Sequence, residues 1–567
     1  MAKIYKLVIK NFRGIKEFSH TFGDFDLICL VGRGDTGKST ILNAISYVLY
    51  PSWNPSFYDT DFFNCGIDNP IEIEATLINI PETLLKEDKY GLYIRGINKE
   101  TGEIEDELRD EHEKALTIKL EIKKDLEPKW YVVNNRQDKP VSISAYDRAK
   151  LNTFIISDYL DAHFHWRRGS PLYSLLKQRD TSDYEDDSIL VEAVREAKNK
   201  IDEHNFTQFE TIMKRLLLKI QELGTDISSD LSSSIDFKDI SIKEGRISLH
   251  DGKVPFRLKG KGTKRLMAIA IQLALVEDGG ILLIDEIEQG LEPDRVKHLV
   301  RTLNKYSKNG QIFISTHSQN VIEELSAENI LLIKRERDGK VQCTKVDQRF
   351  QDVVRACPQA MYAKKVIVCE GKTEKGICRA LDNFRIKEGK SNLSSLEVVY
   401  TLGEGSNLID RALKLKALGL DVCVFSDSDN DSVNQGKELL KQNGIEIFDW
   451  DEGNSTEQQV FLDLPWEAVK ELISFAEEEC SESSVRDSVS AQLNMSSNQL
   501  GDDWKEQDTP EFRDALGNAA KTNKWFKNIS KGGFLGFIIF KYFGQMDAEK
   551  TLKKQLQNLS NWVDENG

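Results

Sequence analysis

The feature that most constrains this fold is a glycine-rich loop between an apolar segment and an amphipathic one. Residues 27–31 are an apolar run typical of a buried strand, and residues 39–49 have helical spacing. The loop between them matches G-x-x-x-x-G-K-[ST], and backbone N–H groups in such a loop surround phosphate oxygens. We expect its lysine to reach the β- and γ-phosphates and its serine to contact Mg²⁺. The candidate nucleotide contacts are Gly32, Arg33, Gly34, Asp35, Thr36, Gly37, Lys38, Ser39 and Thr40.

A second group of polar residues, about 250 positions further on, completes this predicted ATP site. The apolar strand at 281–284 runs into Asp285 and Glu286, which suit Mg²⁺ binding and activation of water, respectively. Another predicted strand, at 312–314, is followed by His317, which resembles a switch histidine that contacts the γ-phosphate. A lone histidine is more often structural, but its place after the next strand favours the functional interpretation.

Length and composition favour a soluble protein of several domains. The 567 residues suit about two to four domains, and no apolar run is long enough for a transmembrane helix. The first residues lack the apolar core of a signal peptide, so we expect a cytoplasmic protein with no membrane partner. A net charge of −16 speaks against a generic nucleic-acid coat, and DNA binding would therefore depend on local basic patches or bridging cations. The eight cysteines include no C-x-x-C pair, which argues against a zinc ribbon.

Two alternations of strands and helices divide the chain. The first is interrupted by a charged helical segment, and the second begins near residue 365 and predicts a second parallel sheet. We therefore predict an α/β fold with an ATPase head, a helical insertion and a second, doubly wound sheet domain. The predicted boundaries are 1–156 and 233–345 for the head, 157–232 for the insertion, 360–465 for the second sheet, and 466–567 for a helical insertion with a completing segment.

Acidic residues follow two strands of the second predicted sheet. The strand at 365–369 runs into E-x-x-x-E, and the strand at 422–425 runs into D-x-D-x-D. Because parallel strands end at one edge of a sheet, these carboxylates would gather there and repel one another without cations. They suit one or two Mg²⁺ or Mn²⁺ ions, and two such ions can promote phosphodiester cleavage. The candidate ligands are Glu370, Glu374, Asp427, Asp429 and Asp431, of which Glu370 and Asp427 are also candidate catalytic residues.

Each acidic pattern alone has an ordinary explanation. An E-x-x-x-E pair is usually a solvated helix face, and D-x-D-x-D is usually a turn. An EF-hand loop fails because glycine is absent at its sixth position and glutamate at its twelfth. The order of the two patterns, each at a strand end, is what favours a metal site.

A basic and aromatic segment at 521–527 is a candidate contact for a scissile phosphate. Lys527 is our first choice for a catalytic lysine and Lys524 our second, and an aromatic neighbour could stack on a base. Alternatively, Trp525 and Phe526 begin an amphipathic helix and lie in the core.

The two motif sets together resemble those of the OLD (overcoming lysogenization defect) nucleases, which join an ABC-type ATPase head to a Toprim-like domain. The long separation of the nucleotide motifs is typical of ABC heads of the SMC and RecF kind, and Arg13 in Asn-Phe-Arg-Gly resembles their nucleotide-proximal arginine. The signature segment at 258–262 lacks the usual serine and glycine pair. The resemblance also implies a further metal ligand, Glu457, with Ser455 beside it.

The same resemblance implies an ATP-binding, metal-dependent DNA endonuclease that acts in defence against phage. The chain is similar to the nuclease subunit of Gabija systems and to OLD effectors linked to retrons, and this resemblance implies a helicase or retron partner. It also implies a homodimer or higher oligomer, with the segment at 157–232 as the dimerisation element.

Three other functions compete with a nuclease. A RecF-like or SMC-like repair protein would bind DNA under ATP control without cutting it, and would leave the acidic clusters unexplained. A topoisomerase or primase would need a DNA-gate domain or a zinc module, neither of which is evident. A regulatory ATP sensor would use the metal site structurally.

Since the signature segment is degenerate, bound nucleotide could restrain DNA cutting rather than drive it.

Overall fold

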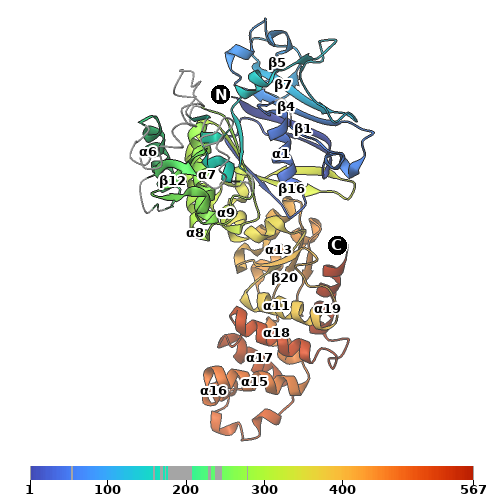
Figure 1. Cartoon of the computed structure of the whole chain (residues 1–567). Helices are drawn as coiled ribbons and strands as arrows, with labels where there is room; N and C mark the ends of the chain where they lie inside the picture. The colour runs from blue at the N-terminus through green and yellow to red at the C-terminus, as the bar shows by residue number, and fades with distance from the viewer. Residues whose placement is uncertain are drawn as a thin grey trace. The chain divides into compact units, whose positions relative to one another are not determined.

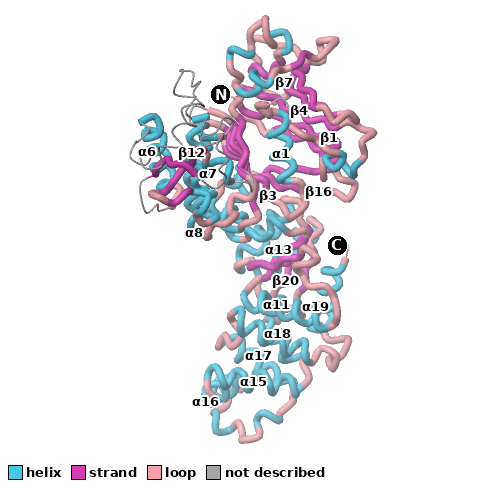
Figure 2. The backbone as a smooth tube through the Cα atoms, in the orientation of Figure 1, coloured by secondary structure: helices cyan, strands magenta, loops and turns pink. Residues whose placement is uncertain are grey.

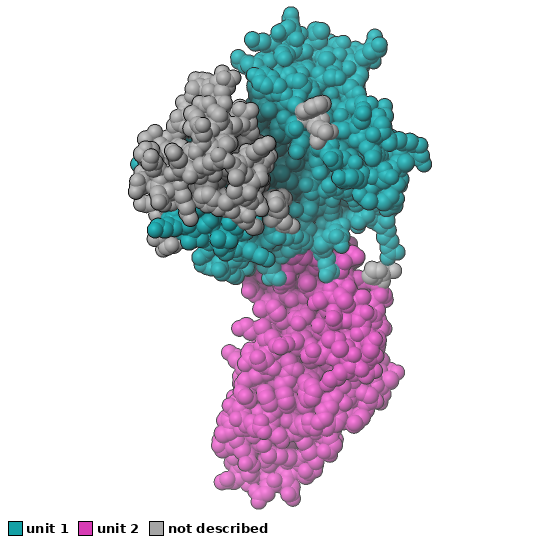
Figure 3. Space-filling model, viewed as in Figure 1, with its two compact units in different colours: residues 1–349 teal, residues 350–567 magenta. Residues whose placement is uncertain are grey.

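The computed structural model describes residues 2–52, 55–156, 160–165, 170–172, 174–175, 207–225, 227, 231–236, 246–276 and 279–565. The chain divides into two compact units, Met1–Arg349 and Phe350–Gly567 (Figure 3). Most of the predicted insertion at 157–232 lies outside the described residues. Among the residues described, none of the helices combines the length and apolarity needed to cross a membrane.

The first unit is built on a 14-stranded mixed sheet (Figures 1 and 2). Its parallel half has the order β10-β14-β15-β3-β16. The sheet continues through β17-β2-β1-β4-β7-β5-β6, with β8 and β9 beyond β7, and these pairings are antiparallel except for the parallel pair β17 and β2. The strands are β1 Lys3–Phe12, β2 Ile15–Thr21, β3 Leu27–Val31, β4 Ile71–Ile78, β5 Arg95–Ile97, β6 Ile104–Glu105, β7 Glu113–Ile122, β8 Pro128–Val133, β9 Val141–Ser142, β10 Thr153–Ile156, β14 Ile281–Ile284, β15 Gln311–Thr316, β16 Ile330–Arg335 and β17 Lys340–Lys345.

The first unit also contains helices and a small antiparallel sheet. Helix α1 packs between β1, β4 and the parallel strands, where its apolar face joins the core. The helices are α1 Lys38–Val48, α2 Ala145–Ala149, α6 Thr207–Glu222, α7 Lys261–Leu275, α8 Pro293–Tyr306 and α9 Gln319–Glu324. The small antiparallel sheet consists of β11 Leu231–Asp236, β12 Arg246–Asp251 and β13 Val254–Pro255.

The second unit contains the predicted second parallel sheet, which has four strands in the order β19-β18-β20-β21. Its strands are β18 Lys365–Cys369, β19 Val398–Leu402, β20 Asp421–Phe425 and β21 Glu446–Phe448. Strand β19 begins directly after Glu397, whose φ of 60° is left-handed and interrupts extended backbone. The predicted α/β fold, with a parallel sheet in the second unit, is confirmed.

Helices make up most of the rest of the second unit, and α11 and α14 to α19 share one core with its sheet. The helices are α10 Gln351–Ala356, α11 Lys372–Lys387, α12 Leu408–Ala417, α13 Asp431–Gln442, α14 Thr456–Asp463, α15 Trp466–Cys480, α16 Glu482–Gln492, α17 Pro510–Thr522, α18 Ile529–Lys541 and α19 Thr551–Asp564. Helices α11 and α18 lie against each other (Figure 1). A Cβ on Gly376 would lie 2.4 Å from the backbone nitrogen of Gly533, so glycine permits this close approach.

Candidate functional site

The phosphate-binding loop joins β3 to α1 and depends on its glycines. Gly37 has a φ of 99°, in the left-handed region that favours glycine. A Cβ at Gly32 would lie 2.5 Å from the carbonyl oxygen of Ile333 on β16. The Lys38 ammonium donates to the carbonyl oxygens of Gly32 and Arg33 at 2.8 and 2.7 Å. The lysine therefore lies across the loop in which we expect phosphates to bind.

Asp285 lies at the end of β14, beside this loop. Its Oδ1 accepts hydrogen bonds from the hydroxyls of Ser39, at 3.0 Å, and Ser315, at 2.5 Å. Glu286 follows with a φ of 46°, and its N–H donates to the Ser315 hydroxyl at 2.8 Å. Strands β14, β15 and β3 are consecutive parallel neighbours, which is why these residues meet although they are far apart in sequence.

Glu288 belongs to the same site, and sequence reasoning missed it. One of its carboxylate oxygens accepts a hydrogen bond from the Thr316 hydroxyl at 2.7 Å, and the other accepts from the N–H of His317 at 2.5 Å. The available signal was a third carboxylate in the run that starts at Asp285. Glu288 fixes the backbone on which the predicted switch histidine stands.

Charges in this site act on one another. Burial lowers the pKa of Lys38 to about 8, although Asp285, Glu286 and Glu288 act in the opposite direction. Burial and the nearby charge of Lys38 also lower the pKa of His317, which is therefore neutral at pH 7. The surplus of carboxylates over lysine matches a site that binds nucleotide together with a divalent cation.

Arg13 is held beside α1 by an aspartate and two aromatic rings. Its Nε donates to Asp61 at 2.8 Å, and its guanidinium lies 5.0 and 5.7 Å from the ring centres of Phe12 and Tyr47. Its proximity to the nucleotide stays a prediction.

The signature-like segment packs against the turn that follows Glu288. A Cβ on Gly262 would lie 2.5 Å from the carbonyl oxygen of Gly290, so the start of α7 rests directly on that turn. Arg265, one helical turn further on, is buried and donates to the carbonyl oxygens of Asp285 and Glu286. Sequence reasoning missed Arg265, because its role depends on contacts between α7 and the residues that follow β14.

In the second unit, Glu370 and Asp427 meet where the parallel neighbours β18 and β20 end. The Asp427 N–H donates to Oε2 of Glu370 at 3.0 Å, and the Asn430 amide donates to its Oε1 at 2.8 Å. Burial and the charges of Asp427 and Asp429 raise the pKa of Glu370, despite these hydrogen bonds. The predicted gathering of carboxylates at this sheet edge is therefore observed for these residues.

Thr456 links two of the predicted ligands. Its hydroxyl oxygen lies 2.5 Å from Oδ1 of Asp427 and 2.8 Å from Oε1 of Glu374, and its N–H donates to the same oxygen of Asp427 at 2.8 Å. The Trp450 indole N–H also donates to this hydroxyl. A hydroxyl has one proton to donate, so a proton on Glu374 completes the network. Burial, followed by the charges of Asp427 and Glu457, raises the pKa of Glu374 to about 8, which is consistent with that proton.

Glu457 lies next to Thr456 and is 1% exposed. Its Oε1 is buried and has no hydrogen-bond partner among the described residues. Burial and the charge of Asp427 raise its pKa, whereas Lys527 acts in the opposite direction. Ser455 instead caps α14, where its hydroxyl accepts a hydrogen bond from the N–H of Gln458. The acidic member of this pair is therefore the one at the cluster.

Basic residues from the end of α17 and the loop after it face these acids. Although burial alone would lower it, the pKa of Lys527 is raised, mainly by Glu457 and Asp427. Lys521 forms an ion pair with Asp429, with 2.6 Å between Nζ and Oδ2, a contact that sequence reasoning missed. Lys524 is exposed and has a φ of 56°.

Two further candidates, Asp431 and Trp525, lie in an exposed and a buried position, respectively. Asp431 is exposed in the first turn of α13. Trp525, like Phe526, is buried in the core, so the core alternative holds and neither ring is free to stack on a base. The turn between α17 and α18 directs the Trp525 indole into the core, so it is not available for base stacking.

The acidic cluster fits a hard divalent cation by its chemistry. Among the described residues, no group of three or more His, Cys, Asp or Glu side chains stands arranged to hold a metal ion. Thr456 and backbone N–H groups hold several of the oxygens instead. The donors are nevertheless all carboxylates, their pKa values are raised by burial and mutual repulsion, and the Oε1 of Glu457 is unsatisfied. These are the properties that a cation would relieve.

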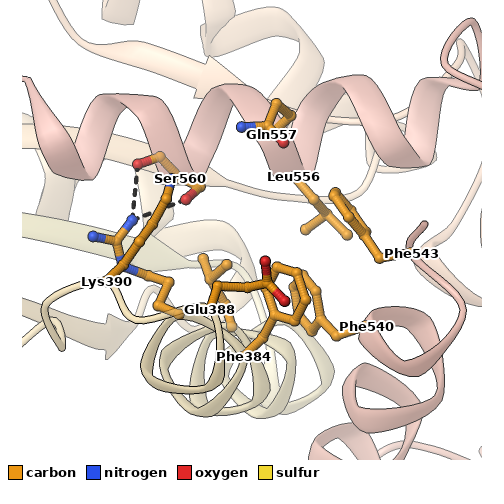
Figure 4. Close-up of a pocket in the computed structure, with 10 residues that line it drawn as sticks. Phe384, Glu388, Lys390, Phe540, Phe543, Leu556, Gln557 and Ser560 are labelled. Atoms are coloured by element: carbon orange, nitrogen blue, oxygen red, sulfur yellow. Dashed lines mark hydrogen bonds between the residues drawn. The ribbon is translucent and has the colours of Figure 1, made fainter.

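A cavity of about 280 Å³ lies elsewhere in the second unit (Figure 4). Phe384, Phe540 and Phe543 form its aromatic wall, and Arg385 beside it donates to both oxygens of Ser560. None of the predicted site residues lines this cavity. It is therefore separate from the acidic cluster.

Comparison with known proteins gives matches in both sequence and structure. Residues 27–323 match the family described as "AAA domain, putative AbiEii toxin, Type IV TA system". The chain is 22% identical over 494 residues to the "Old nuclease" of Escherichia phage P2, and this match covers 77% of the chain and 80% of that protein.

Solved structures of SMC head domains also match. An Smc head from Pyrococcus furiosus bound to the C-terminal domain of ScpA is 16% identical, covers 62% of this chain and 97% of its own, and has a TM-score of 0.39. The SMC head domain from Thermotoga maritima is 16% identical, covers 61% of this chain and 99% of its own, and has a TM-score of 0.30.

Proposed function

We propose, from the premise that the chain belongs to the family described as "AAA domain, putative AbiEii toxin, Type IV TA system", that it is an OLD-type, ATP-binding, metal-dependent DNA endonuclease. We further propose that it acts as a homo-oligomer in defence against phage. The first unit would bind ATP and Mg²⁺, and the second unit would cut DNA.

The observation that carries the nuclease proposal is the set of buried carboxylates at the ends of β18 and β20. Glu374 is 3% exposed, Asp427 7% and Glu457 1%, and each has a raised pKa. An uncompensated cluster of buried acids destabilises a fold, so its presence indicates a functional use. Binding of hard cations that contact a phosphodiester is the use that fits this donor set.

We assign roles to the residues on this basis. Glu370, Glu374, Asp427, Asp429 and Glu457 would hold one or two Mg²⁺ or Mn²⁺ ions, which supply Lewis acidity for attack of water on phosphorus. Thr456 orients Asp427 and takes part in the proton balance of Glu374. Lys527, whose charge interacts with the same acids, would bind a non-bridging oxygen of the scissile phosphate and stabilise its developing charge.

The nucleotide site has its own assignments. Lys38 and Ser39 would bind the phosphates and Mg²⁺, with Asp285 as the second anchor for the cation. Glu286 would activate the attacking water, and His317, held by Glu288, would contact the γ-phosphate. The degenerate signature segment leaves the direction of control open, and we propose that nucleotide restrains cutting.

The nuclease proposal is tested with the purified full chain, supercoiled plasmid and Mg²⁺ or Mn²⁺. We expect nicked or linear product from the wild type and loss of product by at least about 100-fold for Asp427→Ala. Asp421→Ala is the matched control, because it removes an exposed aspartate from the opposite end of the same strand. Equal survival of plasmid with the wild type and with Asp427→Ala, with and without ATP, would contradict the proposal.

One observation favours a second function, an ATP-gated DNA-binding protein that does not cut. In the second unit, Thr456 and backbone N–H groups donate hydrogen bonds to the carboxylates. Among the described residues, these carboxylates are not arranged around a common metal position. That protein would retain plasmid in a gel-shift assay under ATP control but give no product with either metal.

A further inference from the structure

We infer that Lys521 competes with the divalent cation for Asp429 and, when the cation displaces it, binds a backbone phosphate of the DNA strand. Lys521 would thus couple loading of the acidic cluster to binding of nucleic acid. The inference rests on the proposed metal-dependent nuclease function and adds a positioning residue to it.

The ion pair between Lys521 and Asp429 is the starting observation. Lys521 lies in the last turn of α17, and its Nζ is 2.6 Å from Oδ2 of Asp429. The side chain of Asp429 is 19% exposed and that of Lys521 is 42% exposed. The pair therefore lies at the open margin of the cluster, whereas Glu374 and Glu457 lie in its buried interior.

Asp429 differs from the other acids in what holds it. Asp427 and Glu374 contact Thr456, and Glu370 accepts hydrogen bonds from Asn430 and from the Asp427 N–H. These neutral donors can remain while other carboxylate lone pairs bind a cation. The partner of Asp429 is an ammonium group, which carries the same sign of charge as the cation. A divalent cation that takes this oxygen must therefore displace Lys521.

The displaced ammonium has a suitable destination nearby. Lys521, Lys524 and Lys527 are spaced three residues apart, and all three are exposed at the junction between α17 and α18. Lys524 forms no ion pair with any described residue. The charge of Lys527 already acts on Asp427 and Glu457. A strand whose phosphate lies at the acidic cluster would therefore pass these lysines, and a lysine released from Asp429 could bind an adjacent phosphate.

The first test measures Mn²⁺ binding to the full chain without DNA, by calorimetry, for the wild type, Lys521→Met and Lys524→Met. We expect Lys521→Met to bind Mn²⁺ about two- to fivefold more tightly than the wild type, the size of effect expected from a partly exposed ion pair. Lys524→Met removes the same charge from the same junction without breaking an ion pair, and should change the affinity less. Equal affinities for the two variants would overturn the competition between Lys521 and the cation.

The second test measures binding of a short DNA duplex by fluorescence anisotropy, with Ca²⁺ in place of the catalytic metal. With Ca²⁺ present, Lys521→Met should lower the slope of log K against log [salt] by about one phosphate contact. In EDTA the slopes of the variant and the wild type should coincide. A slope that is unchanged in Ca²⁺, or reduced equally in EDTA, would overturn the phosphate role.

These readouts separate this inference from the nuclease proposal. Failure of the nuclease proposal would appear as absence of plasmid cleavage by the wild type with either metal. Failure of the inference would appear in the comparison of Lys521→Met with Lys524→Met, whatever the cleavage result.

Discussion

Replacement of Glu374 by glutamine tests whether the acidic cluster holds a proton in the absence of metal. The carboxyl is 3% exposed, and its pKa is raised from 4.5 to about 8, first by burial and then by the charges of Asp427 and Glu457. Glutamine has nearly the shape of a protonated glutamate. Its carbonyl can accept from the Gly371 N–H and its amide can donate to the Thr456 hydroxyl, which preserves the two observed contacts.

The expected magnitude follows from proton linkage. A folded-state pKa above the unfolded value contributes stability that is complete below pH 4.5 and is lost as the pH rises toward 8. Between pH 5 and pH 7 the unfolded carboxyl is ionised and the folded one is protonated. The wild type should therefore lose about 3 kcal/mol of unfolding free energy over that interval through this group. Glu374→Gln does not titrate, so its stability relative to the wild type should rise by about 2–3 kcal/mol.

The assay is urea unfolding in EDTA at pH 5 and pH 7, followed by tryptophan fluorescence. Glu388→Gln is the matched control, since it replaces an exposed glutamate at the end of the same helix. The pH dependence isolates the titration, because any packing defect of the amide is present at both pH values. A difference between Glu374→Gln and the wild type that is the same at both pH values would refute the reasoning.

Three further predictions concern the cluster, the nucleotide site and the helix contact. Mn²⁺ affinity of the wild type should rise about tenfold between pH 7 and pH 8.5, because the cation must displace the proton of Glu374; a flat calorimetric profile would contradict this. Glu288→Gln should lower ATP turnover about tenfold and leave ATP affinity nearly unchanged, because it weakens the hydrogen bond that holds the backbone of His317. Phosphate release measures turnover, and nucleotide binding measures affinity. Full turnover in the variant would count against this role of Glu288. Gly376→Ala should lower the unfolding free energy of the second unit by about 1–3 kcal/mol, because the new Cβ meets the backbone of α18. The control is Gly501→Ala, where a Cβ meets nothing within 4 Å. Equal stability of the two variants would refute the packing argument.

Local patterns were sufficient to predict most of the elements. The strand at 27–31, the strand at 281–284 and the strand at 365–369 lie where apolar runs predicted them. The reason is physical: strands buried on both faces of a parallel sheet must be continuously apolar, which is visible in sequence. The loop at 32–37 was equally visible, because its backbone requires glycines at fixed spacing.

The catalytic candidates were predicted where chemistry depends on residue type at a strand end. Asp285 and Glu370 follow their strands directly, and Asp427 follows its strand after one residue, so sequence placed them at a sheet edge without knowledge of strand order. Asp431 lies in the first turn of the following helix and is exposed, and its role as a metal ligand stays a prediction.

Only the tertiary structure decided which side chains touch. Thr456, Glu288 and Arg265 act through contacts with residues on other elements, and nothing in their local sequence distinguishes them from ordinary polar residues. The ion pair of Lys521 with Asp429 and the buried position of Trp525 likewise depend on how α17 packs against α14 and how α18 packs against α11. Sequence determined the chemistry available at the strand ends, because it fixes residue type and local periodicity. The fold decided which groups share a proton, an ion pair or a buried environment, because those properties depend on distances between segments far apart in the chain.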